Sequence, residues 1–218
     1  MQYRAGIPAG FFFEDTITNS TYLSFCPTQL PLKSAGHVTY LMEASFCSLP
    51  LYFAVKGKHN YAMANETAFV EAVRIAVASI ANQYDLIVFP ESRYPFLRQV
   101  TEGLPQAREL KKRAKADVCA RTMASRKWSK LERVSQERAW AEMGETFTIN
   151  KVKSNQRKHY APHIFEELDT AGAQRILLLD DFIMSGNTLA AMAASLKLDC
   201  YEAFGVFYQC GQDPSQLA

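Results

Sequence analysis

Two adjacent carboxylates, Asp180 and Asp181, close a continuous apolar run and precede a short segment of small polar residues. Neighbouring carboxylates accept hydrogen bonds from paired hydroxyl groups, such as those of a vicinal diol. The segment combines hydroxyl and amide side chains with a glycine, in the order Met184, Ser185, Gly186, Asn187 and Thr188. Glycine lets the backbone approach an anion closely, and the hydroxyls add donors. This pattern predicts a site for a ligand with a diol at one end and a phosphate at the other, such as ribose 5-phosphate.

The elements expected around this segment place it where ligands bind. Residues 175–180 (RILLLD) predict a strand that is buried on both faces, and residues 185–198 predict a turn followed by a helix. The first N–H groups of a helix lack internal partners and carry a partial positive charge, so phosphate binds there readily. In parallel sheets, ligands bind at the carboxyl ends of strands. The carboxylates and the loop are therefore expected at one sheet edge.

The sequence LLLDDFIMSGNT, preceded by Ile176, resembles the signature of type I phosphoribosyltransferases: four apolar residues, two acids, a variable triplet, then Ser/Thr-Gly-x-Thr. Every signature position is matched. The resemblance implies that Asp180 and Asp181 are the catalytic acids that bind the ribose hydroxyls. It also implies that residues 184–188 hold the 5′-phosphate of phosphoribosyl pyrophosphate (PRPP). The likeness extends weakly from about residue 85 to the C-terminus, and the first eighty residues match no pattern.

Competing interpretations of the same segment are weaker. An acidic pair can close a strand by chance, with SGNT as an ordinary helix start. A P-loop requires Gly-Lys-Ser/Thr, and a dinucleotide fingerprint requires three spaced glycines; the sequence contains neither. The phosphoribosyltransferase fold is therefore the preferred interpretation.

A second loop is expected to bind pyrophosphate. Residues 85–89 (DLIVF) predict a strand, and Glu91, Ser92 and Arg93 follow Pro90 at its end. The arginine fork matches phosphate oxygens, and the serine adds a donor, whereas the glutamate is unfavourable beside a diphosphate unless Mg²⁺ intervenes. In the resembled family this loop commonly has an unusual peptide geometry. The alternative is an ordinary turn with a solvated arginine.

Basic residues are concentrated in one stretch, since residues 108–158 contain 15 of the 24 Lys and Arg but six carboxylates. Such a band indicates an anionic partner, either the phosphates of a small molecule or, as a second choice, nucleic acid. Type I enzymes close a mobile loop over the reaction, and the candidate cations for that loop are Arg121, Arg126 and Lys127. The alternative for each of them is a solvated helix surface.

The remaining pattern predicts an α/β fold with a mostly parallel sheet flanked by helices, because helical and strand-like segments alternate. Helices are expected at residues 66–82, 131–143 and 162–170, and a broken one at 96–114. Further strands are expected at residues 116–120, 147–152 and 201–209, and strand-like pieces at 37–44 and 49–55. We expect residues 1–64 to form an N-terminal hood and residues 65–218 the phosphoribosyltransferase-like core.

The hood is expected to recognise the acceptor. Aromatic side chains can sandwich a nucleobase, but they also pack any small subdomain. The available aromatics are Phe11, Phe12, Phe13, Tyr22, Tyr40 and Tyr52.

The predicted function is a Mg²⁺-dependent phosphoribosyltransferase, a pentosyl glycosyltransferase of nucleotide metabolism. It moves the ribose 5-phosphate of PRPP onto a nitrogen of a nucleobase-like acceptor and releases pyrophosphate. One alternative is a ribose-phosphate or nucleotide-cleaving enzyme on the same fold. Another is a non-catalytic regulator that senses a nucleotide or binds nucleic acid through the basic band. Synthesis of PRPP from ATP is disfavoured because such enzymes resemble two tandem copies of this fold.

The bulk features agree with a cytoplasmic protein. The five cysteines are scattered and odd in number, which is typical of reduced thiols. Neither a signal peptide nor a membrane-spanning run is expected. Dimers are common in the resembled family, so a homodimer is an expectation.

Overall fold

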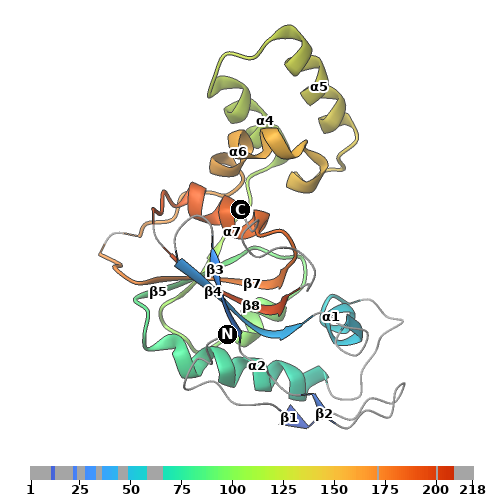
Figure 1. Cartoon of the computed structure of the whole chain (residues 1–218). Coiled ribbons are helices and arrows are strands. Elements are labelled where there is room, and N and C mark those ends of the chain that lie inside the picture. The colour runs from blue at the N-terminus through green and yellow to red at the C-terminus, as the bar shows by residue number, and fades with distance from the viewer. Residues whose placement is uncertain are drawn as a thin grey trace.

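The structure is a computed structural model of the chain, and it describes residues 11–12, 22–23, 28–32, 36–43, 49–57, 66–170, 172–199 and 201–208. Its centre is a six-stranded sheet with the order β3-β4-β8-β7-β5-β6 (Figure 1). The strands are, in that order, Thr28–Leu32, Gly36–Glu43, Glu202–Tyr208, Ile176–Ile183, Leu86–Pro90 and Ala107–Leu110. The five strands from β4 to β6 are parallel, and β3 is an antiparallel edge. The predicted α/β class with a mostly parallel sheet is confirmed.

The central strands are buried because helices cover both faces of the sheet. Alternate residues of a strand point to opposite faces. Accordingly, Leu177 and Leu179 of β7 belong to one core cluster and Leu178 to the other, and all three are fully buried. This explains why the strand reads as a continuous apolar run.

One face carries α1 (Leu49–Val55), α2 (Glu66–Ala81) and α3 (Phe96–Val100), and the other carries α7 (Asn187–Ser195) (Figure 1). Helix α2 buries a stripe of four apolar residues at helical spacing. All four are fully buried: Phe69, Val73, Val77 and Ile80. These were the positions that predicted the helix. The loops at the carboxyl ends of β5 and β7 lead into α3 and α7.

The helical insertion, residues 111–165, connects β6 to β7. It contains α4 (Lys115–Ala124), α5 (Lys130–Ala141) and α6 (Arg157–Tyr160), with short 3₁₀ helices at Ile149–Lys151, Ser154–Gln156 and Ala161–His163. It has its own packed interior, where the rings of Phe147 and Tyr160 stack with centroids 5.1 Å apart. It rests on α7, because the hydroxyl of Ser195 donates to the carbonyl of Ala161 at 3.2 Å.

Several expected elements are wrong. Residues 116–120 were expected to form a strand but lie in α4, which buries Val118, Cys119 and Thr122 at helical spacing. The strand-like residues 49–55 form α1. Short apolar runs cannot distinguish a strand from a buried helix, so the surrounding packing decides.

Boundaries within the chain also differ from expectation. The broken helix at residues 96–114 ends at Val100, and β6 follows it. Instead of a strand, residues 147–152 contain a 3₁₀ turn. Instead of a helix, residues 162–170 continue a 3₁₀ turn into a bridge between Phe165 and Lys112. That bridge ties the end of the insertion to its beginning.

The N-terminal segment contributes to the main sheet. Strand β4, which falls within residues 1–64, pairs with β8, and Tyr40 stacks on Tyr208 with ring centroids 4.7 Å apart. The short strands β1 (Phe11–Phe12) and β2 (Tyr22–Leu23) pair separately. Phe13 lies outside the described residues. The aromatic hood and the division at residue 64 stay predictions.

Candidate functional site

The acidic pair lies near the carboxyl end of β7, in the middle of the sheet. Asp180 and Asp181 are each 7% exposed. The N–H of Asp181 donates to Asp180 Oδ1 at 2.9 Å, so the first carboxylate caps the backbone of the second. Asp180 lies opposite Gly205 of β8. The two acceptor groups are therefore adjacent in the carboxyl half of β7, and Asp180 is three residues before the end of that strand at Ile183.

The electrostatics of this pair favour proton uptake by one member. Burial first, and the neighbouring Asp181 carboxylate second, raise the pKa of Asp180 to about 8. The charges of Lys56 and Lys112 act in the opposite direction. An arriving cation would favour the ionised form of Asp180, because opposite charge stabilises a carboxylate.

A lysine from the turn after α1 reaches the second acid. Lys56 Nζ forms an ion pair with Asp181, and the two side chains are 17% and 11% exposed. The position of the lysine is set by the turn that follows α1, because Gly57 has a φ of 63° and its N–H donates to the carbonyl of Ala54 at 2.8 Å. A Cβ at Gly57 would lie 2.9 Å from Tyr94 Cε1, so only glycine fits between the turn and that ring.

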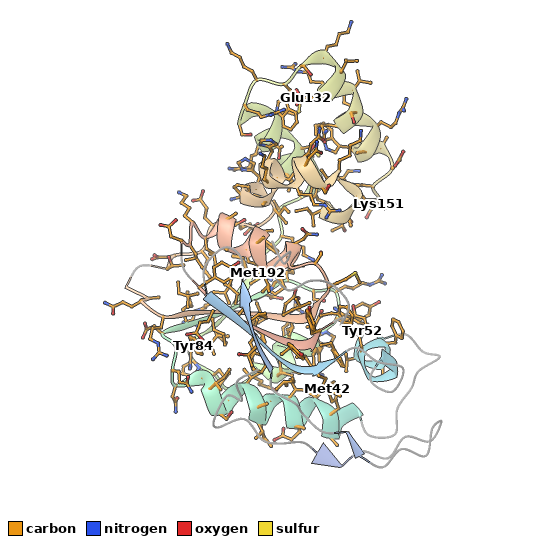
Figure 2. The ribbon with its side chains drawn as sticks, viewed as in Figure 1. Met42, Tyr52, Tyr84, Glu132, Lys151 and Met192 are labelled. Carbon is orange, nitrogen blue, oxygen red and sulfur yellow. The ribbon has the colours of Figure 1, made fainter. Side chains whose placement is uncertain are left out.

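An aromatic wall lies beside the acids. Tyr52, labelled in Figure 2 where α1 meets the sheet, packs on Phe182 with ring centroids 4.6 Å apart and on Phe207 at 5.6 Å. Burial, followed by the charges of Asp181 and Asp180, raises the pKa of the Tyr52 hydroxyl to about 12. This hydroxyl therefore stays protonated and is a donor near the acidic pair.

The expected phosphate loop joins β7 to α7. Gly186 is the N-cap of α7 and has a left-handed backbone with φ 67°, which glycine adopts without strain. Its lack of a side chain leaves the helix start without a side-chain cap. Asn187 Nδ2 donates to Ser185 Oγ at 2.6 Å, which folds the loop on itself. Met184 is 47% exposed and Thr188 is half-buried. The helix start is thus open to an anion.

The expected pyrophosphate loop follows β5. The Glu91 carboxylate accepts the N–H of Lys112 at 2.9 Å and lies 3.7 Å from Lys111 Nζ. The Glu91 carboxylate is therefore already engaged by groups at the start of the helical insertion. Ser92 Oγ accepts the N–H of Tyr94 at 3.3 Å. Arg93 is exposed and makes no ion pair with any described residue. The described peptide bonds are all trans, so the unusual geometry expected from the family is not seen here.

The structure does not bring the three candidate loop cations to the acidic pair. Arg121 pairs with Asp117 at 2.8 Å on α4. Arg126 pairs with Glu132 and stacks over the ring of Trp128 at 4.0 Å. They lie in the helical insertion together with the exposed Lys127. Their closure over the site stays a prediction.

Sequence reasoning missed two cations that act on the acidic pair. Lys56 contacts Asp181, and Lys112 lowers the proton affinity of Asp180 through its charge. Gly57 between two lysines marked a turn in the sequence, and the structure confirms it. Nothing in that local pattern indicates a partner 125 residues away.

Together these groups form one constellation in an α/β protein: paired acids, an uncapped helix start and adjacent cations. Comparison with protein-family models and with curated proteins finds no match. Among the described residues, no group of three metal-ligating side chains is assembled. The described helices include none that is long and apolar enough to cross a membrane.

Proposed function

We propose that the protein is a PRPP-dependent phosphoribosyltransferase with a type I phosphoribosyltransferase-like fold. One observation carries the proposal: the buried acids Asp180 and Asp181 lie in the carboxyl half of a central parallel strand, two residues before the loop that leads to an uncapped helix start. A diol and a phosphate separated by one sugar ring match that arrangement. The substrate class is a ribose 5-phosphate donor, and the acceptor is a nitrogen nucleophile.

Binding begins with the two ends of the ribose phosphate. The acids accept hydrogen bonds from the two ribose hydroxyls, and charge-assisted bonds of this kind are stronger than neutral ones. The phosphate lies against the backbone of Gly186 and the first turn of α7, where the helix dipole favours negative charge. Ser185 and Thr188 supply hydroxyl donors.

The diol competes with Lys56 for Asp181. In the absence of substrate the lysine neutralises this carboxylate. Hydroxyl groups that donate to Asp181 weaken the ion pair and leave a cation beside the bound sugar. That cation, together with exposed Arg93 and Lys112, faces the negative charge of the diphosphate. The cations thus favour departure of pyrophosphate.

A divalent ion fits this site mainly through the substrate. Mg²⁺ keeps several waters and is commonly bound by one or two carboxylates plus substrate phosphates, so no protein cage is required. Asp180 makes no ion pair with a described residue, so its carboxylate is the protein group that would face such an ion. When bound, Mg²⁺ supplies charge neutralisation on the diphosphate.

The reaction is a substitution at C1 of the ribose. The bond from C1 to the pyrophosphate oxygen breaks and its electron pair leaves with pyrophosphate. A lone pair on the acceptor nitrogen forms the new bond to C1, and the acceptor then loses a proton. Positive charge develops on the ring in between, and the carboxylates of Asp180 and Asp181 stabilise it. The aromatic wall of Tyr52 and Phe182 limits water at this position.

Calorimetric titration of PRPP, with and without Mg²⁺, tests the proposal, with ribose 5-phosphate and AMP as comparison ligands. We expect Mg²⁺-dependent binding of PRPP that the double variant Asp180→Asn/Asp181→Asn weakens by roughly a hundredfold, since two charge-assisted contacts are lost. The control variant Glu142→Gln/Asp199→Asn removes two exposed carboxylates elsewhere and should bind normally. Unchanged PRPP affinity in the acidic-pair variant would contradict the proposal.

One observation favours a second candidate, a nucleotide-cleaving enzyme. A carboxyl group whose pKa is about 8 holds a proton near neutral pH and can donate it to a leaving base. Asp180 has this property beside the expected ribose site. Tight binding and slow hydrolysis of AMP, without a response to PRPP, would select this reaction.

A further inference from the structure

The outer surface of the helical insertion carries charge that the proposed reaction does not use. Much of the basic band of the sequence lies there, and Figure 2 shows long side chains with nitrogen tips projecting from this part of the molecule. Helix α5 lies on the side of the insertion that is away from the sheet (Figure 1). This surface is therefore separate from the acidic pair.

The start of α5 is held rigidly. Trp128 is 6% exposed, and its Nε1 donates to the carbonyl of Thr122 at 3.1 Å, which fixes the five-residue turn after α4. Ser129 and Glu132 form a reciprocal capping box at the first turn of α5. Consecutive helices joined by a short fixed turn present the second helix as a preformed element.

The exposed face of α5 combines cations with two apolar side chains. Lys130, Arg133 and Arg138 are exposed, and in the described part of the chain none of them pairs with a carboxylate. Leu131 and Val134 are 86% and 52% exposed, so α5 buries neither. Cations elsewhere in the insertion, such as Arg121 and Arg126, do have carboxylate partners. Helix α5 thus presents three cations that have no carboxylate partner among the described residues.

A groove continues this face toward the next segment of the insertion. Its volume is about 350 Å³, and Lys151 and Lys153 lie across it from α5. Its lining residues are Leu131, Val134, Ser135, Gln136, Arg138, Ala139, Glu142, Lys151, Lys153 and Gln156. Three cations against one carboxylate make the groove positive. The favoured partner is therefore an anion longer than a single phosphate group.

We propose that this face binds duplex DNA, with α5 in the major groove and Lys151 and Lys153 on the phosphate backbone. A helix of 12 residues is about 18 Å long, and the major groove admits an α-helix. In helix-turn-helix proteins the second helix enters the groove with its N-terminal residues on the base edges. Leu131 and Val134 occupy that end of α5 and match the methyl groups of thymine.

The charge pattern favours DNA over an acidic peptide. A peptide helix needs a continuous apolar groove, with anchors at successive helical turns. Here two apolar residues are flanked by Lys130 and Arg133, and Arg138 lies beyond them. Glu137, exposed on the same helix, repels phosphate and accepts a hydrogen bond from a cytosine amino group. Phosphate contacts therefore belong at the two ends of α5.

Fluorescence anisotropy with a labelled duplex of about 24 base pairs tests this site in the full-length protein. We expect binding that weakens steeply as salt rises, because phosphate contacts release counterions. The variant Lys130→Gln/Arg133→Gln/Arg138→Gln should lose at least about tenfold in affinity, and its salt slope should fall by about 3. The control Arg74→Gln/Arg98→Gln/Lys197→Gln removes the same charge from the sheet domain and should bind like the wild type.

Three outcomes would overturn the proposal: no binding at low salt, an equal loss in the control variant, or displacement of DNA by an equimolar acidic peptide. The variant Leu131→Ala/Val134→Ala is an independent test that remains if the triple variant unfolds. It should leave the salt slope unchanged and reduce the preference of the protein among DNA sequences. A salt slope that changes in this second variant counts against the groove model. PRPP titration of all these variants separates the DNA-binding proposal from the proposed reaction, because failure of either proposal leaves the other intact.

Discussion

Lys56 and Asp181 form an ion pair across 125 positions of sequence, and both side chains are largely buried. The pair joins the turn after α1 to the carboxyl half of β7, so it connects one helix layer to the expected ribose site. It also leaves Asp180 without an ion-pair partner among the described residues, beside a second carboxylate. This asymmetry gives the two acids different chemistry although they are adjacent in sequence.

The raised pKa of Asp180 predicts a pH-dependent stability. Its folded-state pKa is raised from 3.8 to about 8, so the folded protein holds this proton more tightly than the unfolded chain. Its contribution to stability is therefore fully present below about pH 4 and is lost as pH rises toward 8. For one proton, the slope is at most about 1.4 kcal/mol per pH unit. Urea unfolding of the wild type and of Asp180→Asn across this range measures it.

The difference between these two unfolding curves isolates the single group. We expect the stability of Asp180→Asn relative to the wild type to increase as pH rises, because the asparagine never becomes charged. Glu142→Gln removes one exposed carboxylate and serves as a control that should follow the wild type. A constant difference between wild type and Asp180→Asn would show that Asp180 has an ordinary pKa.

Replacing Lys56 tests the ion pair directly. Lys56→Met keeps the apolar stem but leaves the Asp181 carboxylate without its cation, and breaking a buried pair from one side is costly. We expect a loss of roughly 3 kcal/mol in the free energy of unfolding near pH 8. The loss should shrink near pH 5, where Asp180 is neutral and one carboxylate instead of two remains unbalanced. An equal loss at both pH values would mean that the contribution of the Lys56–Asp181 pair does not depend on the charge of Asp180.

The phosphate loop predicts a different kind of sensitivity. Gly186→Val places a branched side chain at φ 67° and crowds the start of α7, so binding of ribose 5-phosphate should fall at least tenfold, a loss of about 1.4 kcal/mol. The variant Gly103→Val is the control for backbone strain without crowding, because Gly103 has φ 81° and no atom lies within 4 Å of an added Cβ. Titration calorimetry on both variants compares them. Equal, near-normal affinities would place the anion elsewhere.

The sequence predicted the parts of the fold that depend on local pattern. The apolar run 176–179 and the stripe of α2 have one interpretation each, and both elements are where they were expected. Residues 116–120 have two interpretations, because a short apolar run with Val118 and Cys119 fits a strand or a buried helix face. Only the packed interior of the insertion distinguishes them.

The tertiary partners of the site could not be predicted from the sequence, because they also depend on packing between distant segments. The loop residues Asp180 to Thr188 are contiguous, so their chemistry is readable from the sequence alone. Lys56 contacts Asp181, and the charge of Lys112 acts on Asp180, only because the fold brings the segments that follow α1 and β6 near β7, with β5 between β6 and β7. Glu91 is tied to the backbone of Lys112, a contact that also requires the β5–β6 pairing. Such contacts carry no local signal.

Arg93 gives the sharpest separation between the two ends of the proposed substrate. Its guanidinium is exposed and makes no described ion pair, so it is available to a diphosphate, whereas the ribose and its 5′-phosphate belong to the β7–α7 loop. Arg93→Gln should weaken PRPP binding by roughly ten- to a hundredfold through the loss of a charge-assisted contact. Affinity for ribose 5-phosphate should not change. Arg98→Gln removes an exposed arginine that is already paired with Glu109, so it is the matched control and should leave both affinities intact. Parallel calorimetry of the two ligands decides the matter: a loss shared by both would assign Arg93 to the loop structure, and an unchanged PRPP affinity would remove it from the diphosphate site.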